Sequence, residues 1–408
     1  KRGMNKGMFA NIDAGVGTED RYTGRGMAAV FQDKIRVMGF LNANNTNDMG
    51  FPGGGGGGRF GGARNGLNAS KMVGLNFNYE DKDKLKLNGN VRWNHRDGDV
   101  VSRRASENFV SQKGSFSNSL SQNFSRSDSW SANMRIEWMP DTMTNILFRP
   151  TFSYTKNDGL SNSESGTYSY DPYLYTDNPL SDAGLQALIA ADSVMVNHNR
   201  NRGITYSDSK KAGGMLQINR KLSNNGRNIT LQLNANYSDQ QSKSLSLNNV
   251  HLYQVMNALG QDSTYQTNRW NLTPSKTYSY SAKLTYSEPI MKATYLQFSY
   301  QFSYNRTKSD RSTYDFSNLG EDFFGGLTHD YRSWDGYLNR LGSLGRPFDE
   351  YLDSDLSRYS EYKNYIHDID VMLRVIRKDY NFNVGVKVQP QKTNFIQNYQ
   401  GVYVDTVR

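Results

Sequence analysis

The chain of 408 residues contains no cysteine. This absence excludes a disulfide framework, a thiolate metal site and a cysteine nucleophile. The sequence also lacks any apolar run of the roughly 18 residues that a membrane-spanning helix needs, and its mean hydropathy is −0.76. A membrane location is not excluded, because a barrel strand needs only about five apolar residues on one face of roughly 9–11.

Concentrated positive charge is absent as well. The net charge is +9, but no lysine or arginine run of five or more occurs, and the compact basic footprint of a nucleic-acid-binding protein is missing. The five histidines are far apart, without H-x-x-x-H or H-E-x-x-H spacing, which argues against a zinc site. We therefore expect no nucleic-acid partner.

The sequence does contain a repeated alternation of apolar and polar residues. In residues 129–139, one set of alternate positions is apolar, from Trp130 to Trp138, and the other is polar, including Arg135 and Glu137. Successive side chains of a strand point to opposite faces, so such a strand has one apolar and one polar face. This suits either a half-buried sheet of a soluble sandwich or a barrel with lipid outside and water inside.

Thirteen such strands are predicted. Tight turns follow strands two, four, six, eight, ten and twelve, at residues 32–34, 80–84, 140–142, 223–226, 287–289 and 377–379. Long polar segments, predicted as loops, separate most of the hairpins: 96–128, 156–209, 239–276 and 305–361. Short turns at one rim and long loops at the other are typical of outer-membrane barrels, which have short periplasmic turns and long extracellular loops.

Aromatic residues at the strand ends agree with this interpretation. Rings at the two interface depths form girdles, because they prefer the headgroup zone. The predicted lipid-interface girdle includes Trp93, Trp130, Trp138, Tyr154, Tyr286 and Tyr304. The sequence thus predicts an all-β, antiparallel transmembrane β-barrel, integral to a bacterial outer membrane and surrounded by its lipid.

A barrel of thirteen strands is not expected to be complete. Bacterial single-chain barrels have even strand numbers, and residues 404–408 are predicted as a loop-like tail. An open sheet would expose two unpaired edges in lipid. We therefore expect residues 1–408 to be the N-terminal part of a barrel domain in a longer polypeptide, or to have both edges covered by something else.

Several motifs carry a resemblance to a known family. Residues 2–22 resemble the first barrel hairpin of Bacteroidota outer-membrane β-barrel proteins related to TonB-dependent receptors. Residues 42–51 with the following glycines resemble their first long loop, residues 138–144 a recurrent periplasmic turn, and residues 395–399 a later loop. The resemblance covers essentially the whole chain.

The resemblance implies a barrel of about 22 strands. It also implies a preceding carboxypeptidase-regulatory-like domain and a plug domain that contacts the TonB system. The plug, a TonB box and the later strands are not recognised in this sequence, so the transport competence of this segment alone stays open.

Two motifs invite a ligand-binding interpretation. The glycine run at residues 53–58 lacks the Lys-Ser or Lys-Thr of a phosphate-binding loop and precedes no helix pattern, so a flexible surface loop is favoured. Asp353 and Asp355, near Asp349 and Glu350, offer oxygen ligands for a loop Ca²⁺, but without EF-hand spacing a solvated acidic loop is favoured. No other cofactor is expected.

Inward-facing arginines occur on three consecutive predicted strands: Arg92, Arg135 and Arg149. They form a candidate basic patch on the lumen wall that would attract an anionic solute or acidic groups of a plug. The alternative, which we favour, is ordinary lumen polarity balanced locally by Glu137.

The long segments contain further candidates. Residues 182–196 and 251–259 have helical spacing. The predicted loop contacts for a ligand or a partner protein are Tyr168, Tyr170, Tyr173, Phe323, Phe324 and Trp334. Exposed aromatic rings stack on sugars or anchor partners, and they equally pack loops against one another, which we favour.

Two functions follow. The first is a TonB-dependent-receptor-like barrel that binds a solute and takes it up. The second is a structural or accessory barrel subunit of an outer-membrane complex, in contact with other subunits and without transport. No catalytic constellation is legible, so an enzyme is not expected.

Overall fold

The computed structural model describes residues 6–46, 66–81, 84–109, 116–320, 323–324, 347–378, 380–400 and 402–407. Strands make up most of this part of the chain. Their bounds are β1 Gly7–Val16, β2 Tyr22–Phe31, β3 Ile35–Asn44, β4 Leu67–Asp81, β5 Leu85–Glu107, β6 Phe116–Asp141, β7 Thr144–Tyr168, β8 Met195–Lys221, β9 Asn228–Met256, β10 Asp262–Met291, β11 Thr294–Asp315, β12 Arg358–Ile376, β13 Asn381–Val388, β14 Gln391–Tyr399 and β15 Val402–Val407.

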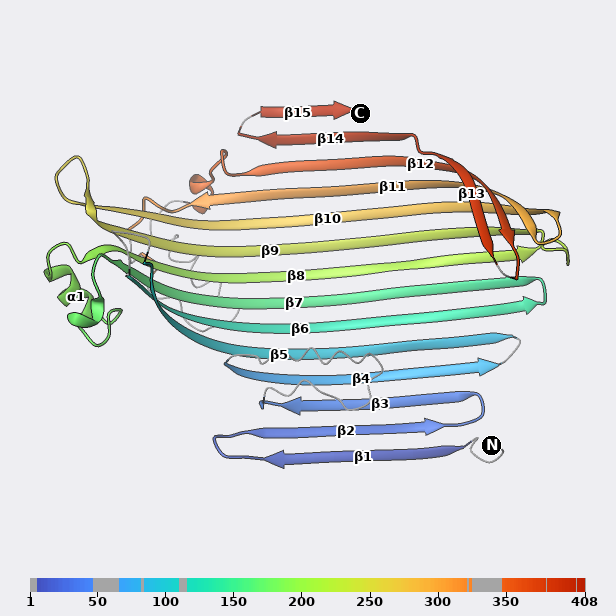
Figure 1. The fold of residues 1–408 in the computed structure, drawn as a ribbon, viewed down its shortest axis with the longest axis horizontal. Helices are drawn as coiled ribbons and strands as arrows, with labels where there is room; N and C mark the ends of the chain where they lie inside the picture. Colours follow the sequence, from blue (N-terminus) through green and yellow to red (C-terminus); the bar gives the residue numbers. More distant parts are fainter. Residues whose placement is uncertain are drawn as a thin grey trace.

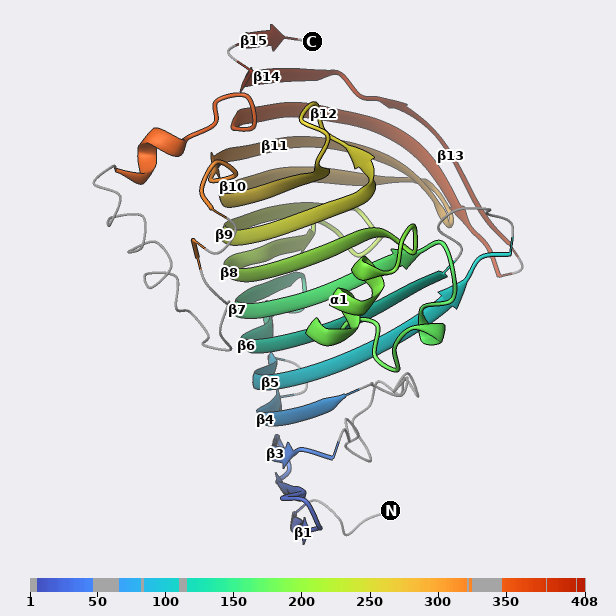
Figure 2. The same ribbon diagram turned by 90° about the vertical axis from the view of Figure 1, so that its left-hand side faces the viewer.

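All of these strands belong to one sheet, in which β1 to β12 follow one another in sequence order, β14 and β15 come next, and β13 pairs only with β12 (Figure 1). Every pairing is antiparallel, from β1 with β2 to β14 with β15. Seen from its end in Figure 2, the sheet is curved rather than flat. The structure confirms the predicted all-β, antiparallel class, as one curved sheet with β1 and β15 at its two ends.

The two faces of the sheet differ as the alternation predicts. We call the side that carries Trp93, Trp130 and Tyr154 the outer face, and the opposite side the inner face. The register places Trp93 opposite Trp130, and Trp130 opposite Tyr154. Because these ladders continue without a shift over many residues, side-chain direction is set by position along the strand.

The prediction of long loops is wrong for most of the segments concerned, because these segments are largely strand. Residues 96–107 and 116–128 belong to β5 and β6, and residues 239–256 and 262–276 belong to β9 and β10. The connection between β9 and β10 is only residues 257–261. The strands extend farther at this end than predicted, and long connections remain there between β7 and β8, at residues 169–194, and between β11 and β12, at residues 316–357.

The predicted count of thirteen strands is also wrong, since the described residues form 15. β13 and β14 both pair with β12, along Ile369–Ile376 and Arg358–Ile366 respectively. Pro390 separates them and donates no backbone hydrogen bond, although its carbonyl accepts the His367 N–H at 2.9 Å. Residues 395–399, predicted as a loop, lie in β14, and most of the predicted loop-like tail lies in β15.

One predicted turn is displaced. Residues 287–289 continue β10, and the chain reverses at Lys292 and Ala293 instead. Ala293 has φ 58°, in the left-handed region that a tight reversal requires. Pro289 suggested a turn, but it lies near a strand end, where a missing N–H is tolerated.

One of the two predicted helices is present. α1 spans Asp182–Ala190, and the Ser181 side chain caps it by accepting the Gly184 N–H at 3.1 Å. The helix predicted within residues 251–259 is wrong: residues 251–256 belong to β9, and His251 pairs with His198 of β8. Two short 3₁₀ helices, η1 Pro172–Leu174 and η2 Phe348–Tyr351, complete the elements.

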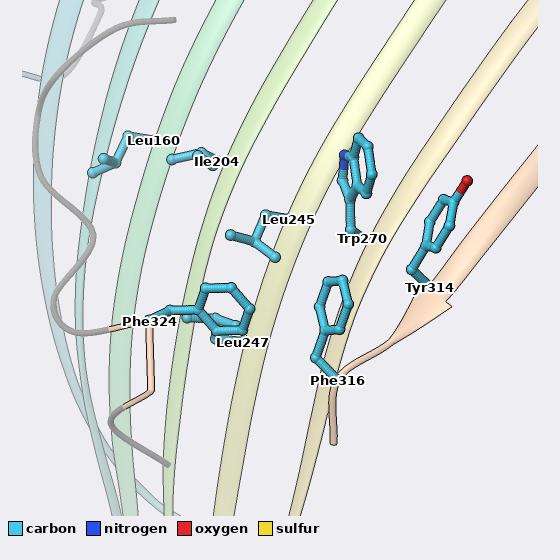
Figure 3. Close-up of a cluster of buried hydrophobic side chains, with 8 residues drawn as sticks. All are labelled: Leu160, Ile204, Leu245, Leu247, Trp270, Tyr314, Phe316 and Phe324. Atoms are coloured by element: carbon cyan, nitrogen blue, oxygen red, sulfur yellow. The ribbon is translucent and has the colours of Figure 1, made fainter. Parts of the chain in front are cut away.

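The main buried cluster lies on the outer face of the strand extensions, away from the short turns. Figure 3 shows its members from β7 to β11 on one side of the sheet, with Phe316 and Phe324 packed over them. We call it the outer cluster: Leu160, Ile204, Leu245, Leu247, Trp270, Tyr314, Phe316 and Phe324. The rings of Trp270 and Tyr314 are stacked with centroids 4.9 Å apart.

A second cluster covers the same face at the ends of β6, β7 and β8. It consists of Tyr168, Leu185, Leu188, Val194 and Met195. Leu185 and Leu188 belong to α1, so the helix seals this end of the sheet. Both clusters fold connections back onto strands, which keeps the extensions ordered.

Candidate functional site

The inner face is mainly polar from β5 to β10. Asn90 and Asn133 of neighbouring strands are joined at 3.4 Å, and Asn78 and Asn88 are also hydrogen-bonded to one another. Further along the sheet, Asn234 donates to the Ser281 hydroxyl at 3.0 Å. Such a surface offers amide and hydroxyl groups to water or to a polar solute.

A shallow recess of about 300 Å³ lies in this polar wall. Its inner-face side chains come from five adjacent strands: Ser131, Asn133, Thr151, Ser153, Lys211, Asn236, Ser238, Thr277 and Ser279. Gly213 makes room there, because a Cβ would lie only 2.2 Å from Oδ1 of Asn236. The recess therefore presents many hydrogen-bonding groups and one ammonium group.

The three predicted lumen arginines lie on the inner face, but they do not act as one cluster. Arg135 donates to Glu137 at 3.0 Å, and Glu137 also accepts from Asn145 at 2.8 Å. Arg92 stacks on the ring of Phe40, 5.5 Å from its centroid. Arg92 pairs with Ser131, four residues along β6 from Arg135, which is about 13 Å at about 3.3 Å per residue. Arg149 is exposed on β7.

The outer face carries the predicted aromatic residues. Trp130 and Trp138 are about half exposed, at 49% and 50%. Tyr154 and Tyr304 are partly exposed on β7 and β11, and Tyr304 contacts Tyr365 with ring centroids 5.0 Å apart. An apolar recess of about 930 Å³ opens on this face beside Trp93, where Gly26, Ala28 and Gly39 of β2 and β3 are small.

Ion pairs tie neighbouring hairpins together at the short-turn end. Arg220 of β8 contacts Asp141 at 2.8 Å. Arg227 makes a two-pronged contact with Glu288, at 2.8 and 2.5 Å, which holds the pKa of that carboxyl below its usual value. Because both pairs are solvent-exposed, they fix geometry more than they add stability.

A titratable cluster lies on the outer face, just beyond Trp93 and Trp130. His95 bridges two carboxylates, Asp128 at 2.7 Å and Asp97 at 2.9 Å. Burial of His95 opposes its charged form, but the hydrogen bonds to Asp128 and Asp97 are stronger and raise its pKa above 6.5. Burial likewise opposes the charged form of Asp97, but the hydrogen bonds from Arg126 and His95 lower its pKa below 3.8. The cluster joins β5 to β6 electrostatically.

The loop aromatics divide into two groups. Tyr168 and Phe324 are buried, at 0% and 1% exposure, so they pack the connections and offer no surface to a ligand. Phe323 is partly buried against Phe324. Tyr170 and Tyr173 are about half exposed, at 56% and 50%.

Some predicted sites lie outside the described residues, and one is used locally. Trp334 and the glycine run at residues 53–58 belong to the segments without description. Asp353 accepts the backbone N–H groups of Asp355 and Leu356 at 2.8 and 3.0 Å, so it caps a turn. Within the described part of the chain, no three His, Asp or Glu residues converge as a metal site, and no helix is long and apolar enough to cross a membrane.

Sequence reasoning missed the recess and the His95 cluster. The recess depends on the register of five strands and the His95 cluster on the register of two, and hydropathy gives neither register. Part of the His95 cluster was visible in the sequence, because His95 and Asp97 are two residues apart and would share one face of a strand just after Trp93. Its second carboxylate is 33 residues away in sequence.

Comparisons with known proteins give weak similarities only. No protein-family model and no curated protein sequence matches the chain. The CymD monoaromatic hydrocarbon channel is 10% identical, with 76% of this chain and 86% of that one covered and a TM-score of 0.19. The alcaligin outer-membrane receptor FauA of Bordetella pertussis is 9% identical (98% and 74% covered, TM-score 0.18), and the copper transporter OprC is 8% identical (99% and 76% covered, TM-score 0.19). At these TM-scores the similarities support no conclusion about fold or function.

Proposed function

We propose that this protein is a transmembrane barrel of a bacterial outer membrane that takes up a polar solute in the manner of a TonB-dependent receptor. The observation that carries the proposal is the two-faced sheet. Apolar and aromatic side chains cover the outer face of the strands near the short turns, and amides, hydroxyls and charges cover the inner face. Each strand between the two edges of such a sheet bonds its backbone to its neighbours and presents apolar side chains to lipid.

The proposal assigns the solute to the inner recess. Its hydroxyl and amide groups suit a hydroxylated or amide-bearing solute, and Lys211 would attract a negatively charged group on that solute. Energy would come from the TonB system of the inner membrane through a plug domain, as the family resemblance implies.

A pair of neighbouring variants tests the recess. Gly213→Gln places a side chain against Asn236 on the inner face, whereas Ala212→Gln makes a similar addition on the outer face. We expect the Gly213 variant to lose solute binding or passage when the intact protein is reconstituted in vesicles, while the Ala212 variant keeps both if it inserts. Equal passage in wild type and the Gly213 variant would refute the assignment of the recess.

One observation favours the alternative function, a scaffold subunit without transport. The connection between β7 and β8 exposes Tyr170, Tyr173 and Leu174, the last at 77%. Exposed aromatic and aliphatic side chains at the end of a sheet suit contact with a partner protein. Stable co-purification with a defined set of outer-membrane subunits, without energised uptake, would support this function over the first.

A further inference from the structure

Five cations gather on the outer face of β8 to β12, a short distance beyond the aromatic residues. We call them the basic patch: Lys210, Lys276, Arg306, Lys308 and Lys363. The register makes them contiguous, because Lys276 pairs with Lys308 and Arg306 pairs with Lys363. Lys210 joins them through Asp239, which pairs with both Lys210 and Lys276.

The tyrosines next to the patch fix its depth relative to a membrane. Tyr237 pairs with Tyr278, with ring centroids 5.1 Å apart, and Tyr304 pairs with Tyr365. On each of three strands, a cation lies on the same face as a tyrosine of this band and two residues farther from the short turns: Lys276 beyond Tyr278, Arg306 beyond Tyr304 and Lys363 beyond Tyr365. Since tyrosine rings prefer the interfacial zone, the patch lies at the level of the lipid headgroups.

Acidic side chains do not neutralise the patch. Glu361 is buried and accepts from Nε of Arg306 at 2.7 Å, while Nζ of Lys363 lies 3.2 Å from it. Asp239 is 3.8 Å from Lys276. Asp208 and Asp310 also lie on this face, two residues from Lys210 and Lys308. Four carboxylates therefore face five cations, and an excess of one positive charge remains.

The cations also have suitable donor geometry. The bond from Nε of Arg306 to Glu361 leaves the two terminal amino groups of the guanidinium unused by that bond, and its side chain is 39% exposed. Lys276 is 49% exposed, and Lys308 lies beside the Tyr359 ring, 5.3 Å from its centroid. A guanidinium fork beside several ammonium groups matches the oxygens of a phosphate.

We propose that the basic patch binds the phosphate groups of lipid headgroups in the leaflet beside the long strand extensions. This inference rests on the proposed membrane location, but it adds a lipid site that a solute-uptake function does not require. Charge complementarity and continuity with the tyrosine band identify the occupant as a phosphorylated lipid.

The test compares two double variants of the intact protein that remove the same charge from opposite faces. Lys276→Gln/Lys308→Gln changes the patch without touching Glu361. Lys283→Gln/Arg374→Gln is the matched control, because both of its residues lie on the inner face of the same strands or their neighbours. Each protein is reconstituted in phosphatidylcholine vesicles containing phosphatidic acid, and the retained lipid is identified by native mass spectrometry after mild extraction.

We expect wild type and the inner-face control to retain phosphatidic acid over phosphatidylcholine. The patch variant should lose this preference by roughly fivefold for each lysine removed, as for a lysine at a membrane surface. An unchanged preference in the patch variant, or an equal loss in the control, would overturn the inference. Inorganic phosphate is added in a separate arm, and its displacement of the lipid at low concentration would assign the site to free phosphate instead.

Flotation of the vesicles separates this inference from the membrane proposal. Protein that floats with the vesicles but shows no phosphatidic-acid preference would overturn the lipid site alone. Protein that does not float would overturn the proposed membrane location as well.

Discussion

Met134 provides a quantitative test of the two-faced sheet. It lies on the outer face of β6, opposite Gly89 of β5. It is four residues from each of Trp130 and Trp138, or about 13 Å along the strand at about 3.3 Å per residue. At a strand tilt of roughly 45°, this places Met134 about 9 Å from each girdle tryptophan, at the middle of the apolar band.

Met134→Arg should therefore destabilise the membrane-embedded protein by about 2–4 kcal/mol, the cost of arginine at mid-depth on the lipid face. Asn133→Arg is the matched control, because Asn133 is exposed on the inner face of the same strand and should change stability by less than about 1 kcal/mol. A loss of 3 kcal/mol lowers the folding equilibrium constant by roughly 100-fold.

Denaturant unfolding of the intact protein from vesicles measures the difference, with the five tryptophans as fluorescent reporters. The free energy of unfolding is obtained for wild type and for both variants under identical lipid conditions. Equal destabilisation by the two arginines, or a larger effect at Asn133, would refute the assignment of the faces.

Three further predictions concern local contacts. Because the pKa of His95 is raised, its contribution to β5–β6 stability should be complete below pH 6.5 and fall as the pH rises through the folded-state pKa, whereas the contribution of Asp97, whose pKa is lowered, should be complete above pH 3.8 and fall at lower pH. Hydrogen exchange of the β5–β6 extension should therefore be slowest between pH 3.8 and 6.5. An exchange rate that does not change with pH, after correction for intrinsic chemistry, would contradict this. Leu188→Ala removes a fully buried side chain of α1 and should cost about 2–5 kcal/mol in the local opening of the helix, seen as faster exchange confined to the β7–β8 connection; unchanged protection there would contradict the packing. Gly74→Val places a Cβ within 2.2 Å of the Phe40 ring and should lower the free energy of unfolding by about 1–3 kcal/mol. Most of this loss should be recovered when Phe40→Ala is added in a double-mutant cycle, whereas additive losses would contradict the contact.

The sequence predicts the fold best where one strand face is apolar. The alternation around Trp130 and Ile136 identifies β6 because the two faces meet different surroundings, and the same signal locates most hairpins. Beyond Trp130 the strand continues as Ser129 to Phe116 with few apolar residues. These positions carry no strong period-2 signal, so a strand was predicted as a loop.

Residues near the ends of elements show a second limit. His251 and Tyr253 lie on one face of β9, but the apolar residues between 251 and 259 also fit a helix, and only pairing with β8 decides between them. The inner recess and the basic patch depend on registers among five strands each. β8, for example, contributes Lys211 to the recess and Lys210 to the basic patch, and the sequence alone does not show which lysine contacts which neighbouring strands' residues.

The central claim, lipid on the outer face and water on the inner face, is tested most directly by single-cysteine labelling along β6. Because residues 1–408 contain no cysteine, each introduced thiol is the only labelled position in this part of the protein. Ala132 and Met134 lie on the outer face, and Ser131 and Asn133 on the inner face. In vesicles, an environment-sensitive label should be quenched by a lipid-soluble quencher at 132 and 134 and by a water-soluble quencher at 131 and 133. Equal accessibility of all four labels to the water-soluble quencher would contradict the account.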